Sequence, residues 1–141
     1  MYKGEKIPII DSKTGKIKKD YSVEQLIEKA REMRAYNMIS ITAAGSGHTG
    51  GTLSIMDIAA ALYLKKIRHD PANPTWEDRD RVFWSVGHKA PALYIALAEA
   101  GYFPLDDTVK LRKLWSGFEG QNFRRLFGPG VRGRHRLCFK C

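Results

Sequence analysis

The longest regular pattern of apolar and polar positions begins at Ser22. Apolar side chains then recur every three or four residues, as on one face of an α-helix: Val23, Leu26, Ile27, Ala30, Met33, Met38 and Ile41. Ser22 followed three residues later by Gln25 forms a capping box, which is typical of a helix start. The pattern predicts a helix of about 20 residues, which ends in a glycine-rich loop over 43–54.

Further helices are predicted on the carboxyl side of the glycine loop. Ser54 is a helix-capping residue, and the helical spacing after it continues to about Lys66. A later helix opens at Pro91, because proline is favoured in a first turn, and stops at Gly101. One more helix is predicted over 108–115.

The segments between and before these helices are less regular. Residues 68–76 hold two prolines and an Asn-Pro step, so we predict a connection there. Residues 82–85, Val-Phe-Trp-Ser, form a short β-rich run that predicts a buried strand. Residues 1–20 are rich in lysine, and their apolar run is interrupted by proline, so we expect an irregular basic arm. Helices alternating with a strand indicate an α/β protein.

The composition narrows the class of protein. The chain has 141 residues, enough for one domain, and no apolar run of signal-peptide or membrane-spanning length, so we expect a cytoplasmic protein with no membrane partner. Its net charge is +9, but residues 122–141 contribute six of the 24 basic residues and no acid, which leaves 18 basic against 15 acidic elsewhere. Cys138 and Cys141 supply only two of the four ligands of a structural zinc, so we predict no metal site there.

Two histidines lie where ligands are commonly bound. His48 is surrounded by glycines, which allow the backbone to approach a ligand closely. His88 and Gly87 come after the predicted strand and before a helix, where α/β proteins bind anions. The glycines around His48 also satisfy G-x-G-x-x-G, a dinucleotide fingerprint. A helix rather than a strand leads into that loop, which disfavours the dinucleotide interpretation.

Several motifs, in order, resemble the amino-terminal part of transketolase. They are Ser-Gly-His-Thr-Gly-Gly-Thr-Leu-Ser at 46–54, Asp-Ile at 57–58, His-Asp-Pro at 69–71, Asn-Pro at 73–74, Arg-Asp-Arg at 79–81, Gly-His at 87–88 and Ala-Pro-Ala-Leu-Tyr at 90–94. The resemblance covers about residues 20–117 and suggests a partial domain over 21–121 with an Arg-rich tail over 122–141. The length resembles the split form of the family, in which this half is a separate chain.

The resemblance implies a fold, an activity and a set of site residues. The fold would be an incomplete thiamin diphosphate-binding fold, with helices packed on a mostly parallel sheet. The enzyme would transfer a two-carbon ketol unit between sugar phosphates in the pentose phosphate pathway. His48 matches the histidine that faces the sugar, and His88 with Gly87 matches the contact to the cofactor diphosphate. Gln121 stands where the family usually has another sugar-contacting histidine, and it donates hydrogen bonds but carries no proton.

The same resemblance implies partner chains and shows that one motif of the family is missing from this sequence. A carboxy-terminal pyrimidine-domain subunit of transketolase would complete the enzyme, in a homo- or hetero-oligomer. The family's Gly-Asp-Gly…Asn motif, which holds Mg²⁺ on the diphosphate, does not occur in this sequence. We therefore expect a truncated chain that is inactive alone, binds thiamin diphosphate with Mg²⁺ weakly or not at all, and has an irregular or frame-shifted tail over 132–141.

Two alternatives stay open from the sequence. A fragment of 1-deoxyxylulose-5-phosphate synthase would share the Ser-Gly-His and Gly-His motifs, although Asp-Pro-x-Asn-Pro and Arg-Asp-Arg favour transketolase. A noncatalytic remnant would serve as a partner protein or bind nucleic acid through its Arg-rich tail, because clustered arginines attract phosphates without sequence preference.

Overall fold

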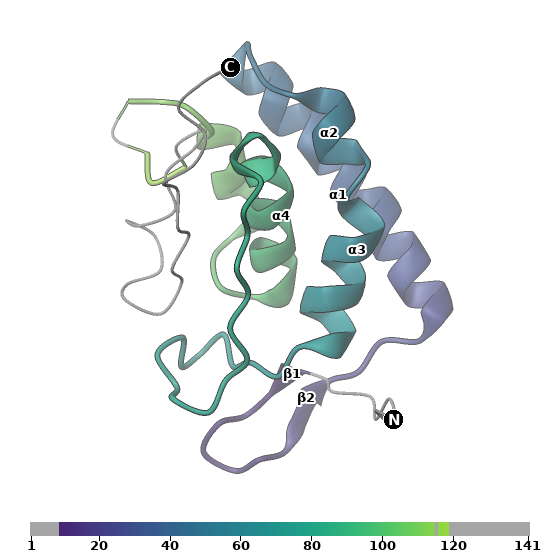
Figure 1. Cartoon of the computed structure of the whole chain (residues 1–141), viewed down its shortest axis with the longest axis vertical. Helices are drawn as coiled ribbons and strands as arrows, with labels where there is room; N and C mark the ends of the chain where they lie inside the picture. The colour runs from purple at the N-terminus through teal and green to yellow at the C-terminus, as the bar shows by residue number, and fades with distance from the viewer. Residues whose placement is uncertain (1–8, 115, 119–141) are drawn as a thin grey trace.

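The computed structural model of the chain describes residues 9–114 and 116–118 (Figure 1). A short hairpin is followed by helices and helical turns: β1 (Ile9–Ile10), β2 (Ile17–Lys19), α1 (Val23–Ala44), α2 (Thr49–Leu53), α3 (Met56–Ala61), the π-helical turn η1 (Leu62–Lys66), the 3₁₀ turn η2 (Gly87–Lys89), α4 (Ala90–Ala100) and the 3₁₀ helix η3 (Leu105–Lys110). The hairpin lies at the opposite end of the helices from α2. Within the described ranges no helix is long and apolar enough to cross a membrane.

Helix α1 confirms the first predicted helix. The Ser22 hydroxyl accepts a hydrogen bond from the Gln25 amide at 3.2 Å, and the Gln25 side chain accepts one from the Ser22 amide at 2.9 Å. These two bonds satisfy amides that would otherwise have no partner at the helix start. The helix ends at Gly45, whose φ of 67° lies in the left-handed region that glycine adopts without strain.

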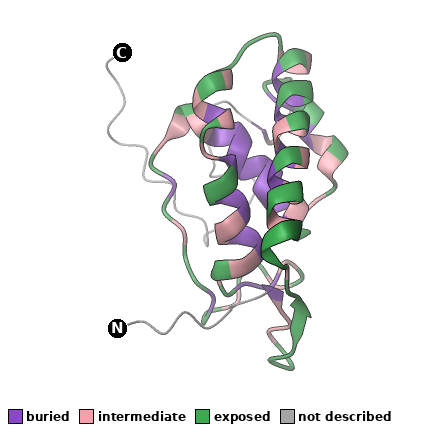
Figure 2. Cartoon of the chain, turned by 90° about the vertical axis from the view of Figure 1, so that its right-hand side faces the viewer, coloured by how far each residue is buried: buried purple, intermediate pink, exposed green. Residues whose placement is uncertain are grey.

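Helix α4 forms the centre of the molecule. Every residue in it is buried except Glu99, and α1, α3, η1 and η3 all pack against it. Figure 2 shows the burial on the inner faces of the helices and the exposure on the outer face of α1. As predicted, proline stands in the first turn, and Gly101 ends the helix with a φ of 101°. Burial of this one apolar helix on several sides supplies the main hydrophobic core.

The helix predicted after Ser54 is present as α3, which starts at Met56, and an unpredicted short helix, α2, precedes it. The segment 49–53 already forms α2, so Gly50 and Gly51 are helical, and Ser54 follows the carboxyl end of α2. The Ser54 hydroxyl donates to the Gly51 carbonyl at 2.9 Å instead of capping the next helix. Propensity favoured a loop because each glycine weakens a helix, but packing of α2 against α1 and α4 overrides that preference. The predicted end near Lys66 is confirmed by η1.

The expected irregular arm contains a hairpin within its described part. β1 and β2 pair antiparallel, with Ile9 opposite Lys19 and Ile10 opposite Ile17. The Ile9 side chain is buried, and the Ile10 amide donates to the His69 carbonyl at 3.1 Å. The sequence pattern missed this hairpin because its strands are too short to show a regular alternation, and its attachment to residues 69–70 is distant in the chain.

Two other predicted elements differ from the structure of the described residues. Residues 82–85 run between connections without forming a strand, and 108–115 is replaced by η3, which begins earlier and ends at Lys110. Among the described residues the one sheet is the antiparallel hairpin, so a parallel sheet is not seen there. A strand requires a hydrogen-bonded neighbouring strand. The β-rich composition of residues 82–85 shows only that these side chains suit a strand, and it does not supply that neighbour. Because the described residues form helices and a small sheet, the general prediction of an α/β protein still holds.

Candidate functional site

His48 lies at the junction between the glycine loop and α2. Its carbonyl accepts two hydrogen bonds from Thr52, one from the amide at 3.0 Å and one from the hydroxyl at 2.6 Å. Thr52 is itself fully buried, so the donor side of this attachment is shielded from water. The His48 side chain is exposed and takes no part in capping the helix. The backbone of His48 is therefore fixed while its imidazole faces outward.

Gly47 brings the same loop close to the end of α1. A Cβ atom built on Gly47 would lie 3.1 Å from the Ile41 Cγ2 atom, which is closer than side chains normally pack. Glycine is required here for close approach rather than for an unusual φ. The loop consequently rests against Ile41, and His48 follows directly.

His88 is brought to His48 from a distant part of the sequence. It lies in η2, immediately before α4, and the Lys89 amide closes this turn on the Val86 carbonyl at 2.9 Å. The ring centroids of His48 and His88 are 5.7 Å apart, with an edge-to-face angle of 63°. The two histidines singled out in the sequence thus share one site, and Gly87 belongs to the same turn.

Gly51 keeps space open between these side chains. A Cβ atom at Gly51 would lie 3.4 Å from the His88 Cδ2 atom and 3.6 Å from the Lys89 Cε atom. Within the described part of the chain, neither the His48 nor the His88 imidazole has a hydrogen bond to protein. Imidazole N–H groups and an ammonium group suit an anion such as a diphosphate, so the residues present fit that end of the cofactor.

The described residues fit a magnesium ion less well. Among residues 9–114 and 116–118 there is no group of three histidine, cysteine, aspartate or glutamate side chains that could hold a metal. Gln121, Cys138, Cys141 and the tail over 122–141 lie outside the described residues. The predictions made for them, including nucleic-acid binding by the tail, stay predictions.

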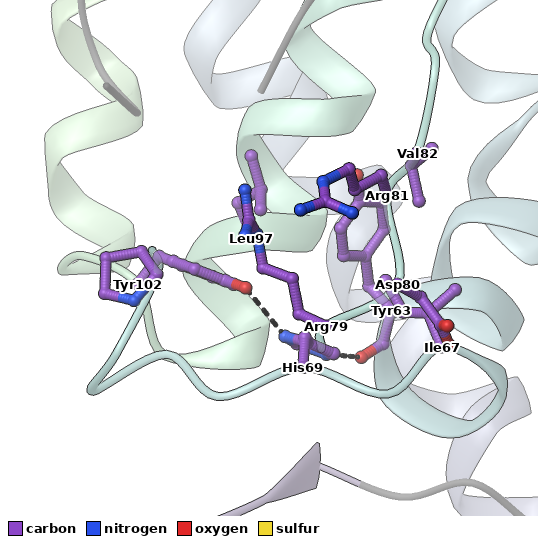
Figure 3. A pocket seen from close by; sticks show the side chains of 10 residues that line it. Tyr63, Ile67, His69, Arg79, Asp80, Arg81, Val82, Leu97 and Tyr102 are labelled. Atoms are coloured by element: carbon purple, nitrogen blue, oxygen red, sulfur yellow. Dashed lines mark hydrogen bonds between the residues drawn. The ribbon is translucent and has the colours of Figure 1, made fainter. Parts of the chain in front are cut away.

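A third histidine, His69, has entirely different surroundings (Figure 3). It is 1% exposed, and its Nε2 donates to the Tyr63 carbonyl at 2.8 Å because a carbonyl can only accept. Its Nδ1 therefore accepts from the Tyr102 hydroxyl at 2.9 Å, and the two rings stack. Burial lowers the pKa of His69, which keeps the ring neutral. The adjoining cavity of about 30 Å³ has room for little more than a water molecule.

Comparison with known proteins decides the family. Residues 25–123 match the family described as the transketolase thiamine diphosphate binding domain. The chain belongs to this transketolase family. It is 47% identical over 81 residues to the 6-deoxy-6-sulfo-D-fructose transketolase subunit SqwG of Clostridium sp. (strain MSTE9), a match covering 57% of this chain and 30% of that protein.

Complete transketolases match the same domain. Identity is 39% over 103 residues to transketolase 2 of Aliivibrio fischeri (strain ATCC 700601 / ES114), covering 72% of this chain and 15% of that protein. It is 39% over 92 residues to transketolase 2 of Escherichia coli (strain K12), covering 64% and 14%. The transketolase domain in this chain therefore spans less than a third of the length of these relatives.

The sequence did not reveal two contacts that shape the transketolase-like site. Thr52 holds the His48 carbonyl, and Arg112 Nη1 donates to the Ser46 hydroxyl at 2.7 Å. The spacing of four residues between His48 and Thr52 would have indicated the first contact if a helix had been predicted there. No local pattern indicates the second, because it joins segments far apart in the chain.

Proposed function

We propose that this chain is the amino-terminal, thiamin diphosphate-binding part of a transketolase that transfers a two-carbon ketol unit between sugar phosphates. The observation that carries the proposal is the convergence of His48 and His88, with 5.7 Å between their ring centroids. The matched relatives bear the transketolase name, which favours ketol transfer over 1-deoxyxylulose-5-phosphate synthesis. The donor chemistry of the site is consistent with an anionic cofactor that Mg²⁺ accompanies.

Each residue of the site would have a separate role, which depends on its position. Thiamin diphosphate, when bound, supplies the nucleophilic carbon that accepts the ketol unit. The His88 imidazole, with the Gly87 backbone beside it, would bind the diphosphate, and Lys89 would add positive charge. His48 would face the sugar and donate or accept a proton at a ring nitrogen, because a neutral imidazole has one nitrogen that donates and one that accepts a hydrogen bond. Gln121 would add a hydrogen bond to the sugar.

The fixed backbone of His48 supports its proposed role. General acid–base catalysis requires a ring held within hydrogen-bonding reach of a substrate oxygen. Thr52 fixes the His48 carbonyl through two hydrogen bonds, and Gly47 seats the preceding residues on Ile41. The exposed imidazole then has a rigid base and an open face, which suits it to contact a substrate.

We further propose that residues 82–86 join a mostly parallel sheet in the complete domain. Phe83 is 65% exposed and its neighbour Trp84 is 7% exposed, which is the alternation of a strand with one buried face. Amide exchange over 82–86 is expected to slow at least tenfold when the chain is extended by the segment that follows in a matched transketolase, because ladder hydrogen bonds protect amides. Unchanged exchange in the extended protein would contradict this assignment.

The relatives also suggest a partner chain and substrates for this domain. The matched Clostridium protein is named as a subunit of a 6-deoxy-6-sulfo-D-fructose transketolase. By analogy we propose that a separate pyrimidine-domain chain completes this enzyme in a hetero-oligomer. Sugar phosphates are the proposed substrates, and 6-deoxy-6-sulfofructose is the competing donor to include in an assay.

Reconstitution tests the proposed function. The chain, Mg²⁺, thiamin diphosphate and a pyrimidine-domain chain of a split transketolase are assayed for transfer from a ketose phosphate to an aldose phosphate. Transfer is expected only with both chains, and His48→Ala and His88→Ala should each lower it by about 10²-fold or more. Arg31→Ala is the matched control, because Arg31 is exposed on α1 and pairs only with Glu28 among the described residues. Absence of transfer with both chains present, or full activity of His48→Ala, would reject the proposal.

A further inference from the structure

The Arg112 side chain contacts the loop that carries His48. Its Nη1 atom donates to the Ser46 hydroxyl at 2.7 Å, although the two residues are 66 positions apart. Ser46 lies between Gly45 and Gly47, two positions before His48. This hydrogen bond therefore acts on the part of the loop where the backbone has most freedom.

The backbone that carries Arg112 is anchored in the core. Its φ of 58° is a left-handed value, which is uncommon for a residue with a side chain. The Arg112 amide donates to the Phe118 carbonyl at 2.8 Å, and the preceding Leu111 is 1% exposed. The Phe118 ring packs edge-on against Tyr94 at 5.3 Å and Phe103 at 5.1 Å. The surroundings thus hold a conformation that the residue alone disfavours.

We propose that Arg112 is a positioning residue that holds the loop 45–48 and so fixes the His48 imidazole beside His88. Thr52, in α2, fixes the His48 carbonyl, and Arg112 binds Ser46 in the residues that precede His48. The catalytic consequence rests on the proposed function, whereas the restraint of the loop does not.

Backbone dynamics of the full chain test the restraint without any ligand. In ¹⁵N relaxation, the order parameters of Gly47 and His48 are expected to fall from about 0.85 to below 0.6 in Arg112→Gly and in Ser46→Ala. Glycine is chosen at 112 because it accepts the left-handed φ, so the fold is retained. The double variant should fall no further than either single variant, because both remove one interaction.

Lys113→Ala is the matched control, since Lys113 is the exposed neighbour of Arg112. Its order parameters at Gly47 and His48 should equal those of the parent chain. Unchanged values in both Arg112→Gly and Ser46→Ala, or an equal fall in Lys113→Ala, would overturn the proposal.

The reconstituted enzyme tests the consequence for His48. Arg112→Gly is expected to lower kcat by about threefold to tenfold with little change in the KM for the ketose, and Arg112→Lys should recover part of the loss. A fall in loop order without any transfer activity in the parent chain would leave the restraint standing and reject the proposed function. Parent activity with an unaltered kcat in Arg112→Gly would reject the positioning role.

Discussion

The two histidine environments of this chain differ in both burial and hydrogen bonding. His69 is 1% exposed, and protein groups engage both of its ring nitrogens. His48 and His88 are exposed, meet edge to face, and within the described residues have no hydrogen bond to protein at their rings. A histidine whose hydrogen bonds are already satisfied in the core contributes to the fold, whereas a fixed but unsatisfied pair is available to a ligand.

Replacing His69 should produce the largest loss of stability. His69→Ala opens a cavity and leaves the Tyr63 carbonyl and the Tyr102 hydroxyl without this partner, so we expect the free energy of unfolding to fall by about 3–4 kcal/mol. Chemical denaturation measures the change. His48→Ala is the matched control and should change stability by less than about 0.5 kcal/mol, because its side chain is exposed. Equal losses in the two variants would remove the distinction between the two environments.

Asp70, next to His69, should give the next largest effect. Burial alone raises the pKa of its carboxyl, but hydrogen bonds from Lys18, Ser12 and the Ala72 amide outweigh burial and lower that pKa well below 3.8. Asp70→Asn removes the charge that these donors stabilise. It should cost about 1–3 kcal/mol of unfolding free energy at pH 7.

The lowered pKa of the Asp70 carboxyl also determines how the stability of the fold changes with pH. The stabilisation by Asp70 is present above the pKa of the unfolded chain, near 3.8, and is lost as the pH falls toward the lower pKa of the folded chain. Stability of the parent should therefore fall below about pH 4, and Asp70→Asn should show a shallower fall. Asp78→Asn, at an exposed position, should keep the parent's dependence. An identical acid transition in Asp70→Asn and the parent would contradict the account.

A smaller effect is expected at Thr52, which links the fold to the site. Thr52→Val keeps the shape of the side chain but removes the hydroxyl that donates to the His48 carbonyl at 2.6 Å. The Thr52 amide keeps its own bond to that carbonyl, so we expect a loss of only about 1 kcal/mol, measured by denaturation. Thr75→Val, at an exposed position, should cost less. A neutral Thr52→Val would mean that the amide alone fixes His48.

The sequence predicted those features of the fold that depend on local signals. Ser22 with Gln25 marked the start of α1 and the glycine-rich loop its end. Pro91 and Gly101 marked the limits of α4, because each acts through its own backbone or its nearest neighbours. The β1–β2 hairpin is attached to the distant residues 69–70, and the run at 82–85 has no strand partner among the described residues. No local pattern contains that information.

The same division applies to the site. His48 and His88 were found from their motifs, but their contact depends on the packing of α2 against η2, which only the fold reveals. The glycines around His48 predicted a loop over 43–54, whereas Gly50 and Gly51 lie in α2. The bond from Arg112 to Ser46 was invisible for the same reason as the hairpin, because its partners lie 66 positions apart.

The most direct test of the central claim is an NMR titration of the full chain with thiamin diphosphate, observing the ring Cε1–H signals of the histidines. Millimolar concentrations of thiamin diphosphate allow even weak binding to be detected. We predict that His88 shifts most, that His48 also shifts, that His69 stays unchanged, and that thiamin without its diphosphate has little effect on His88. An unshifted His88 at saturating thiamin diphosphate, or an equal response to thiamin alone, would contradict the account.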